Sequence, residues 1–210
     1  MAGSVLKLKE EGARIAHLDR DRGLVEAARR DPAQFDALYR KYLAQVYSFA
    51  YYELRDQHAA EDATERVFMQ ALAGLPRFEE RLDAFAMPEG EIPADISTFR
   101  VWLFRIARNV IANERRRTGR RPVAPLEAAS ELISPDDVME IAAAREAGSA
   151  AWEAVARLPE DRRRVVILRF VEEMSTTEIG AILGRSEGAV RVLLHRALRS
   201  VEADLRKRMS

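Results

Sequence analysis

The sequence contains no cysteine among its 210 residues. This absence excludes a disulfide framework and any metal site built on thiolate ligands. It is typical of proteins that work in a reducing compartment.

Long apolar runs are missing as well. No stretch of about 18 uncharged apolar residues occurs, so the sequence predicts no membrane insertion. The first residues, 1–20, lack the apolar segment of a secretory signal and are only weakly patterned, and we assign this extension no function. We therefore expect a cytoplasmic protein.

Neither sign of charge is in excess, because 34 Lys and Arg residues balance 34 Asp and Glu residues. This balance argues against a nonspecific polycation, although the charges are segregated along the chain. The 3 histidines lie far apart, and no metalloprotease, phosphate-loop or nucleophile-elbow motif is present. We find no catalytic constellation and expect neither a metal nor a cofactor.

The most informative stretch is residues 174–200. Ser175 stands three residues before Glu178, the spacing of a capping box, which predicts a helix start. Gly184 follows an apolar stripe where a chain leaving a helix often needs positive φ, and Ser186 is a second N-cap candidate. Two short helices joined by a glycine turn indicate a helix-turn-helix.

Gly180 supplies a small residue inside the first of these helices, where two steeply crossed axes must approach. The outward face of the second helix carries polar and basic side chains that suit the DNA major groove, namely Ser186, Glu187, Arg191, His195 and Arg196. The alternative is an ordinary helical hairpin with a solvated basic face.

The N-terminal half predicts a short helix from Asp21, a break at Asp31 and Pro32, and a long helix whose aromatic stripe belongs to the core. A further helix spans Ala60 to Leu72 and has an acidic face. That face is either solvated or docks an arginine-rich partner, and periodicity cannot distinguish these alternatives.

A strongly basic helix begins at Thr98. Its apolar residues project to one side, and the opposite arc carries Arg105, Arg108, Asn109, Arg115 and Arg116. Between Arg105 and Arg121 there are seven arginines and one glutamate, a density that favours a polyanion such as a nucleic-acid backbone. The alternatives are a solvated face and a membrane-surface helix, although no exposed apolar wedge supports the latter.

Two acidic segments lie before and after this basic helix. Residues 79–97 carry six acidic residues against Arg81, and their prolines and glycine predict a loop. Residues 118–148 read as a flexible acidic linker. The sequence therefore predicts an all-α protein with two small helical domains, 21–117 and 149–210.

Four blocks in order, FDALYRKY, AAEDATERVFMQAL, TFRVWLFRIARNVIANERRR and LPEDRRRVVILRFVEEMSTTEIGAILGRSEGAVRVLLHRALRSV, resemble a bacterial RNA polymerase sigma factor. The resemblance is to the two-domain extracytoplasmic-function group of the sigma-70 family. It implies a region 2 bundle and a region 4 helix-turn-helix, and a role in promoter recognition, strand opening and transcription initiation.

The resemblance also implies partners. RNA polymerase core, through its β and β′ subunits, would bind the helix that carries Asp62, Glu65, Phe68, Gln70 and Leu72. Promoter DNA would meet the minus-ten residues Arg105, Arg108, Asn109, Asn113, Arg115 and Arg116 and, at the minus-thirty-five element, the recognition-helix residues named above. Whether an anti-sigma factor is a further partner stays open.

This chain departs from the family pattern in three places. Glu65 stands where glutamine is frequent, the acidic loop at 79–97 is unusually long, and Glu187 could accept from a cytosine or repel phosphate. We hypothesise that the loop restrains DNA entry, so that shortening it would raise transcription or relax promoter choice. The competing functions are a stand-alone operator-binding regulator, which would bind without polymerase, and a non-catalytic helical adaptor.

Overall fold

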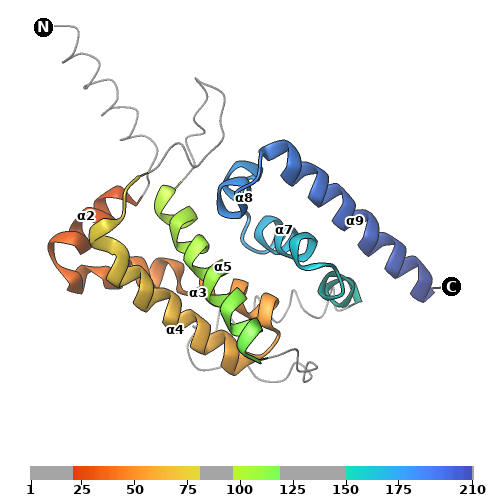
Figure 1. The fold of residues 1–210 in the computed structure, drawn as a ribbon, viewed down its shortest axis with the longest axis horizontal. Coiled ribbons are helices and arrows are strands. Elements are labelled where there is room, and N and C mark those ends of the chain that lie inside the picture. The colour runs from red at the N-terminus through yellow and green to blue at the C-terminus, as the bar shows by residue number, and fades with distance from the viewer. Residues whose placement is uncertain (1–20, 81–96, 119–149, 210) are drawn as a thin grey trace, which may run out of the picture.

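The computed structural model describes residues 21–80, 97–118 and 150–209, in which all regular structure is helical (Figure 1). The all-α prediction is confirmed. The N-terminal half comprises α2 (Arg22–Arg30), α3 (Phe35–Leu54), α4 (Gln57–Gly74) and α5 (Thr98–Thr118), with 3-10 turns at Pro32–Gln34 and Leu75–Arg77. The C-terminal half comprises a helical segment at 150–156, α7 (Glu160–Phe170), α8 (Thr176–Leu183) and α9 (Glu187–Met209).

Local chemistry sets the predicted break between α2 and α3. The Asp31 carboxylate accepts from the backbone N–H of Ala33 at 3.0 Å, and Pro32 occupies the first helical position, where it has no donor to lose. Asp56 caps α4 in the same way, accepting from the N–H of Ala59 at 2.8 Å. Two helical segments of this half, the turn at Pro32–Gln34 and α4, therefore begin where a short aspartate side chain caps the backbone.

The N-terminal bundle is built from α3, α4 and α5, which pack against one another around an aromatic core. Phe49 and Phe104 are fully buried, with ring centroids 5.4 Å apart. Phe78 lies edge-on to Phe99 at 5.7 Å. The predicted aromatic stripe is therefore core.

Asp21 anchors three parts of this bundle. Its side chain is fully buried and accepts hydrogen bonds from Lys41 and Tyr42 of α3 and, at 2.7 Å, from Ser97 just before α5. Burial raises the pKa of the Tyr42 hydroxyl well above its usual range, so the hydroxyl remains a donor. These bonds join the chain before α2 to both longer helices.

The two halves share the larger of two buried apolar clusters, and the smaller one, of Val155, Leu158, Val166 and Ala197, lies within the C-terminal half. A single cluster of buried apolar residues runs from α2 to α9, and α5 packs on α8 while α3 packs on α7 (Figure 1). Tyr52 of α3 and Trp152 of the helical segment that precedes α7 have ring centroids 4.7 Å apart. The division into domains stays a prediction, and the extension 1–20, most of the acidic loop and nearly all of the linker lie outside the described residues.

One predicted core residue is placed differently. Val165 and Leu168 are buried as expected, but the side chain of Phe170 is 54% exposed. Phe170 is the last residue of α7, where the face it shares with Ile167 is no longer covered. The apolar residues between Trp152 and Phe170 predict a core that includes Phe170, and for this residue the prediction was wrong.

Candidate nucleic-acid interface

The helix-turn-helix forms as its sequence predicts. The Ser175 hydroxyl accepts from the N–H of Glu178 at 3.1 Å, and the Glu178 carboxylate accepts from the N–H of Ser175 at 2.9 Å, which completes the capping box. Gly184 ends α8 with φ of 65°. At Gly180 an added Cβ would lie 2.7 Å from the Arg185 carbonyl oxygen, so only glycine lets the turn pass this close.

The start of α9 presents a polar, basic face to solvent. Val190 and Ala197 are fully buried and fix the orientation of the helix. Of the predicted recognition residues, Ser186 caps α9 by accepting from the N–H of Ala189 at 3.3 Å. Arg191, His195 and Arg196 are all exposed on the outward side.

The carboxylate of Glu187 already has two partners within the helix-turn-helix. It accepts from the Thr176 hydroxyl of α8 at 2.8 Å and pairs with Arg191 one turn later. The bond from Thr176, together with Arg191, lowers the pKa of Glu187. Glu187 therefore links the two helices of the motif and holds Arg191 in place.

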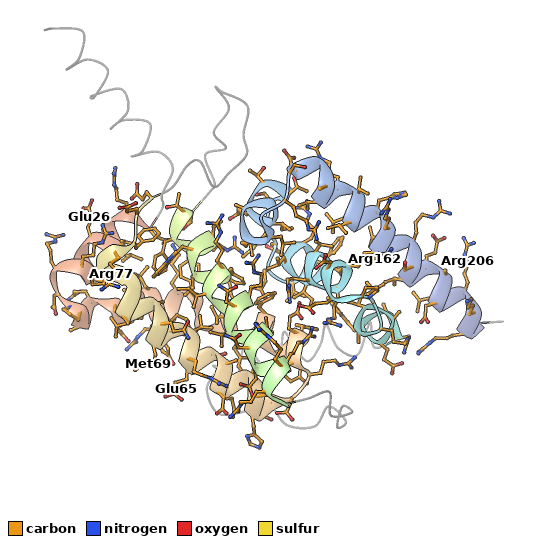
Figure 2. The ribbon with its side chains drawn as sticks, in the orientation of Figure 1. Glu26, Glu65, Met69, Arg77, Arg162 and Arg206 are labelled. Atoms are coloured by element: carbon orange, nitrogen blue, oxygen red, sulfur yellow. The ribbon has the colours of Figure 1, made fainter. Side chains whose placement is uncertain are left out.

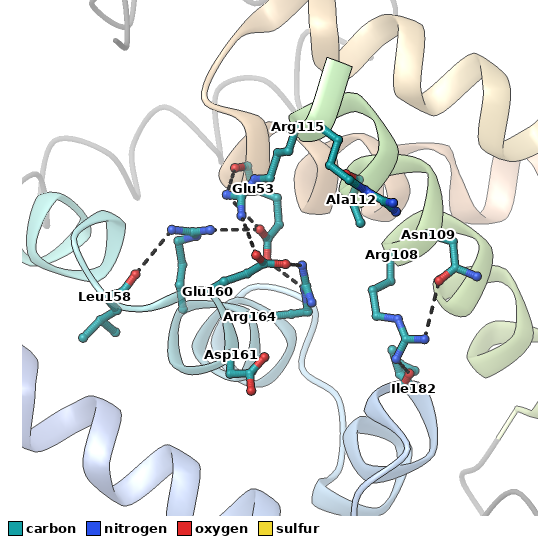
Figure 3. Close-up of polar contacts among 12 residues, drawn as sticks. Glu53, Arg108, Asn109, Ala112, Arg115, Leu158, Glu160, Asp161, Arg164 and Ile182 are labelled. Carbon is teal, nitrogen blue, oxygen red and sulfur yellow. Dashed lines mark hydrogen bonds and ion pairs between the residues drawn. The ribbon is translucent and has the colours of Figure 1, made fainter. Parts of the chain in front are cut away.

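The basic side chains of α5 are divided between solvent and the C-terminal half. Asn109, Asn113 and Arg116 are exposed, as expected for residues that meet DNA. Arg105 and Arg108 instead donate to backbone carbonyls of α8. Arg115 pairs with the buried carboxylate of Glu53, at 3.1 Å (Figure 3).

The basic helix also buries a second apolar face that sequence analysis missed. Phe104, Ala107 and Ile111 are fully buried, in addition to the predicted Phe99 and Leu103. The ring of Phe104 lies 5.4 Å from that of Phe49 in α3, so α3 covers this second side while α4 also packs on α5. The alternation of apolar and basic residues gave a visible signal, but only the packing of α3 showed that this side is covered.

The outer face of α4 is exposed and mixes acidic with apolar side chains. Among the residues predicted to contact polymerase, Asp62, Glu65, Gln70 and Leu72 are exposed. Met69 was missed, although its side chain is 62% exposed between them. Figure 2 shows Glu65 and Met69 on the side of α4 that points away from the C-terminal half.

Phe68 does not belong to that face. It is only 5% exposed, and its ring lies 4.8 Å from that of Tyr39 and 6.4 Å from that of Phe35. An aromatic side chain held in the core cannot contact a partner directly. We therefore remove Phe68 from the predicted contact surface and assign it to packing.

No group of three or more His, Cys, Asp or Glu side chains within 21–80, 97–118 and 150–209 is arranged to hold a metal ion. No helix in these ranges is both long and apolar enough to cross a membrane.

These features define an all-helical protein with a helix-turn-helix of the DNA-binding type, and comparison with known proteins gives its family. The sigma-70 region 2 model matches residues 38–87, and the sigma-70 region 4 model matches residues 149–201. The ECF RNA polymerase sigma factor ShbA of Streptomyces griseus is 31% identical over 151 residues, which cover 70% of this chain and 72% of ShbA. The chain belongs to the sigma-70 family, within the ECF group of RNA polymerase sigma factors.

Other relatives differ in length. The ECF sigma factor BldN of Streptomyces coelicolor is 31% identical over 184 residues, or 85% of this chain, but the match spans only 63% of BldN. SigW of Bacillus subtilis is 26% identical, with 79% of this chain and 85% of SigW covered.

Solved structures share the fold. CnrH in complex with the cytosolic domain of CnrY has a TM-score of 0.60 at 24% identity, with 90% of this chain and 99% of that chain covered. The sigma factor RpoE in complex with the anti-sigma factor NepR from Bartonella quintana has a TM-score of 0.57 at 20% identity, with 82% and 96% covered. At these identities the likeness concerns the fold alone.

Proposed function

We propose that this chain is an alternative sigma factor that binds RNA polymerase core, recognises promoter DNA and directs the opening of its strands. The observation that carries the proposal is the joint presence of an exposed recognition face on α9 and a second basic helix, α5, in one chain. A regulator that binds one operator needs only the first. The chain would act in the cytoplasm, with the polymerase.

The outer face of α4 is the proposed contact with polymerase core, through its β and β′ subunits. An exposed Met69 beside Leu72 provides apolar area, and Asp62, Glu65 and Gln70 surround it with polar groups. An apolar centre with a polar rim is the usual composition of a protein interface. Acidic groups also favour a basic partner surface.

Promoter DNA is the proposed partner of α5 and α9. On α5, arginine guanidinium groups would hold phosphates while the exposed amides of Asn109 and Asn113 read the edges of unstacked bases. On α9, Arg191 and Arg196 are placed to fork onto guanine edges or phosphates in the duplex. Strand opening would then use binding energy on captured bases, and the chain would supply no catalytic group, metal or cofactor.

An anti-sigma factor is a further proposed partner. RpoE, which shares the fold, was solved with the anti-sigma factor NepR. A protein that covered the outer face of α4 would block the proposed binding of polymerase core. One that covered α5 or α9 would block the proposed binding of promoter DNA.

Run-off transcription tests the function. Purified chain is added to bacterial RNA polymerase core with a library of promoter templates, and the products are sequenced. We expect chain-dependent transcripts that share two upstream sequence elements. Specific promoter binding without core polymerase, and no transcripts with it, would contradict the proposal and favour an operator-binding regulator.

Replacing Met69 with glutamate should weaken binding to core polymerase about tenfold, because a charge would be buried against the partner's apolar surface. Fluorescence anisotropy of labelled chain titrated with core measures this. The matched control is Ala203→Glu, which adds the same charge at an exposed position near the end of α9. Equal losses in both variants would mean that net charge, and not the α4 face, governs binding.

Replacing Arg191 with alanine should weaken binding to a promoter duplex about tenfold and relax sequence preference at one base position, because one guanidinium fork is lost. Gel-shift titration of the holoenzyme on a duplex with randomised positions measures both effects. Arg206→Ala, at an exposed site on the same helix, is the control and should retain affinity. A uniform loss over all sequences would assign Arg191 to phosphate contact alone.

A further inference from the structure

Val192 is an exposed apolar residue in the second turn of α9. Its side chain is 49% exposed, whereas Val190, on the opposite side of the helix, is fully buried. Residues three and four positions apart share one face of a helix, so Val192 lies on the same face as Gly188, His195 and Arg196. Val192 is therefore within the face proposed to read DNA, and not at its margin.

The surface of α9 before Val192 is open. Gly188 lies one turn earlier on the same face, and no heavy atom of the described residues lies within 4 Å of the Cβ that would be added there. A glycine on an exposed face lets another molecule approach the backbone closely. The methyl groups of Val192 are therefore accessible from the amino end of α9, the end whose residues contact base edges when a recognition helix enters the major groove.

The preceding side chain, Arg191, is held on another side of the helix. It pairs with Glu187, and the Glu187 carboxylate also accepts from the Thr176 hydroxyl of α8 at 2.8 Å. Adjacent residues of a helix do not face each other. Arg191 and Val192 therefore form two separate contact points, one charged and one apolar.

Basic side chains surround Val192. Arg191 precedes it, and Arg196 and Arg199 follow it along the helix, all of them exposed. Such a surface attracts the phosphate backbone of a nucleic acid whatever its sequence. It does not suit an apolar protein partner, because the guanidinium groups would have to be desolvated. The charge around Val192 therefore favours DNA as the molecule that covers it.

An apolar side chain in this position adds nothing to phosphate binding, so its contact is with a base edge. In the major groove, thymine presents a 5-methyl group, and the other three bases present no methyl group. Val192 has no hydrogen-bonding atom in its side chain, so it would leave the polar groups of those bases without partners. Against thymine it would bury methyl against methyl, which is worth about fourfold in affinity for one buried carbon.

We propose that Val192 is a specificity-determining residue that packs against the 5-methyl group of one thymine in the minus-thirty-five duplex. The inference rests on the proposed function and deepens it, because it assigns one kind of base to one side chain. Arg191 and Arg196 hold the duplex by charge and hydrogen bonds, while Val192 selects thymine at a single position.

The test uses holoenzyme and a promoter duplex selected in the run-off experiment. Each thymine of its upstream element is replaced in turn by deoxyuridine, which lacks only the 5-methyl group and keeps every hydrogen-bonding atom. Gel-shift titration should show one replacement that weakens binding by wild type about fourfold. Val192→Ala should bind the unmodified duplex about fourfold more weakly and should not distinguish thymine from deoxyuridine at that position.

Leu198→Ala is the matched control, because Leu198 is 47% exposed on the same helix and its replacement also removes apolar surface. This variant should keep the full response to deoxyuridine. Circular dichroism confirms that both variants retain their helices, as expected for alanine at exposed helical positions. A merely structural role for Val192 would weaken binding to every duplex equally and leave the preference for thymine intact.

A second probe adds the methyl group instead of removing it. At the sensitive position the thymine is changed to cytosine, and then to 5-methylcytosine, which carries a methyl group on the same ring carbon. Wild type should bind the methylated duplex about fourfold more tightly than the unmethylated one. Val192→Ala should bind the two duplexes equally.

Two results would overturn the assignment and leave the proposed function intact. One is wild-type binding that responds to deoxyuridine at no position of the upstream element, and the other is a response that Val192→Ala retains in full. Run-off transcription with core polymerase is scored separately on the same preparations. No transcripts from any template would refute the proposed function and, with it, the base contact.

Discussion

Replacing Gly180 with alanine should lower the free energy of unfolding by about 2 kcal/mol. The added Cβ would lie 2.7 Å from the carbonyl oxygen of Arg185, so the backbone of the turn would have to move. Overpacking of this kind costs about 1–3 kcal/mol, and the backbone shift places the cost at the upper end. The gain in helix propensity, about 1 kcal/mol, offsets only part of it. Urea denaturation followed by circular dichroism measures the difference.

The control for this prediction is the same substitution at Gly188 in α9. No atom lies within 4 Å of the Cβ that would be added there, so Gly188→Ala should stabilise the chain by about 0.5 kcal/mol through helix propensity alone. If the two variants were equally stable, the close approach at Gly180 would have no energetic role. The turn of the helix-turn-helix would then tolerate larger residues.

Replacing Glu172 with glutamine should stabilise the chain by about 3 kcal/mol near pH 8 and have little effect near pH 5. Glu172 is only 3% exposed, and its Oε1 has no hydrogen-bond partner among the described residues. Burial raises the pKa of its carboxyl group from 4.5 to about 8, although Arg100 of α5 and the Ser48 hydroxyl of α3 act in the opposite direction. Glu178 of α8 shares Arg100 and so weakens its effect.

The sign follows from proton binding. Between pH 4.5 and about 8 the folded chain keeps a proton on Glu172 that the unfolded chain has released. Stability therefore falls as pH rises through this window, by at most about 1.4 kcal/mol per pH unit, and levels off above it. Glutamine keeps the shape of the neutral side chain and cannot lose a proton. The Glu172→Gln variant should therefore not lose stability as the pH rises through this window.

Urea denaturation of both proteins across this pH range measures the effect as a difference, so the other titrating groups largely cancel. Glu173→Gln, one residue further at an exposed position, should follow wild type at every pH. A constant difference between Glu172→Gln and wild type would show that the carboxylate stays charged throughout.

The helix-turn-helix was predictable because its signals are local. Ser175 and Glu178 cap one another across three residues, and Gly184 takes the left-handed conformation that ends α8. The break at Asp31 and Pro32 depends in the same way on neighbouring atoms. Side chains that bond to the backbone within one turn act in any tertiary context, so their effect can be inferred from the sequence.

The exposed surfaces were harder to predict. The predicted polymerase contact included both Phe68 and Leu72, yet Phe68 is buried and Leu72 is exposed, while the missed Met69 is more exposed than either. Helical spacing gives the direction of a side chain, but not how far the neighbouring helices extend over it. Phe170 illustrates the same limit at the end of α7.

The sequence by itself determined the helices, their caps, the basic character of α5 and the turn of the helix-turn-helix, because each depends on residues within a few positions. Only the tertiary structure decided which partners those charges meet. Arg115, Arg163 and Arg164 surround Glu53 across sequence separations of 62, 110 and 111 residues. An arginine bonds equally well to a carboxylate, a helix-end carbonyl or a phosphate, and its choice depends on which acceptor folding brings within about 3 Å.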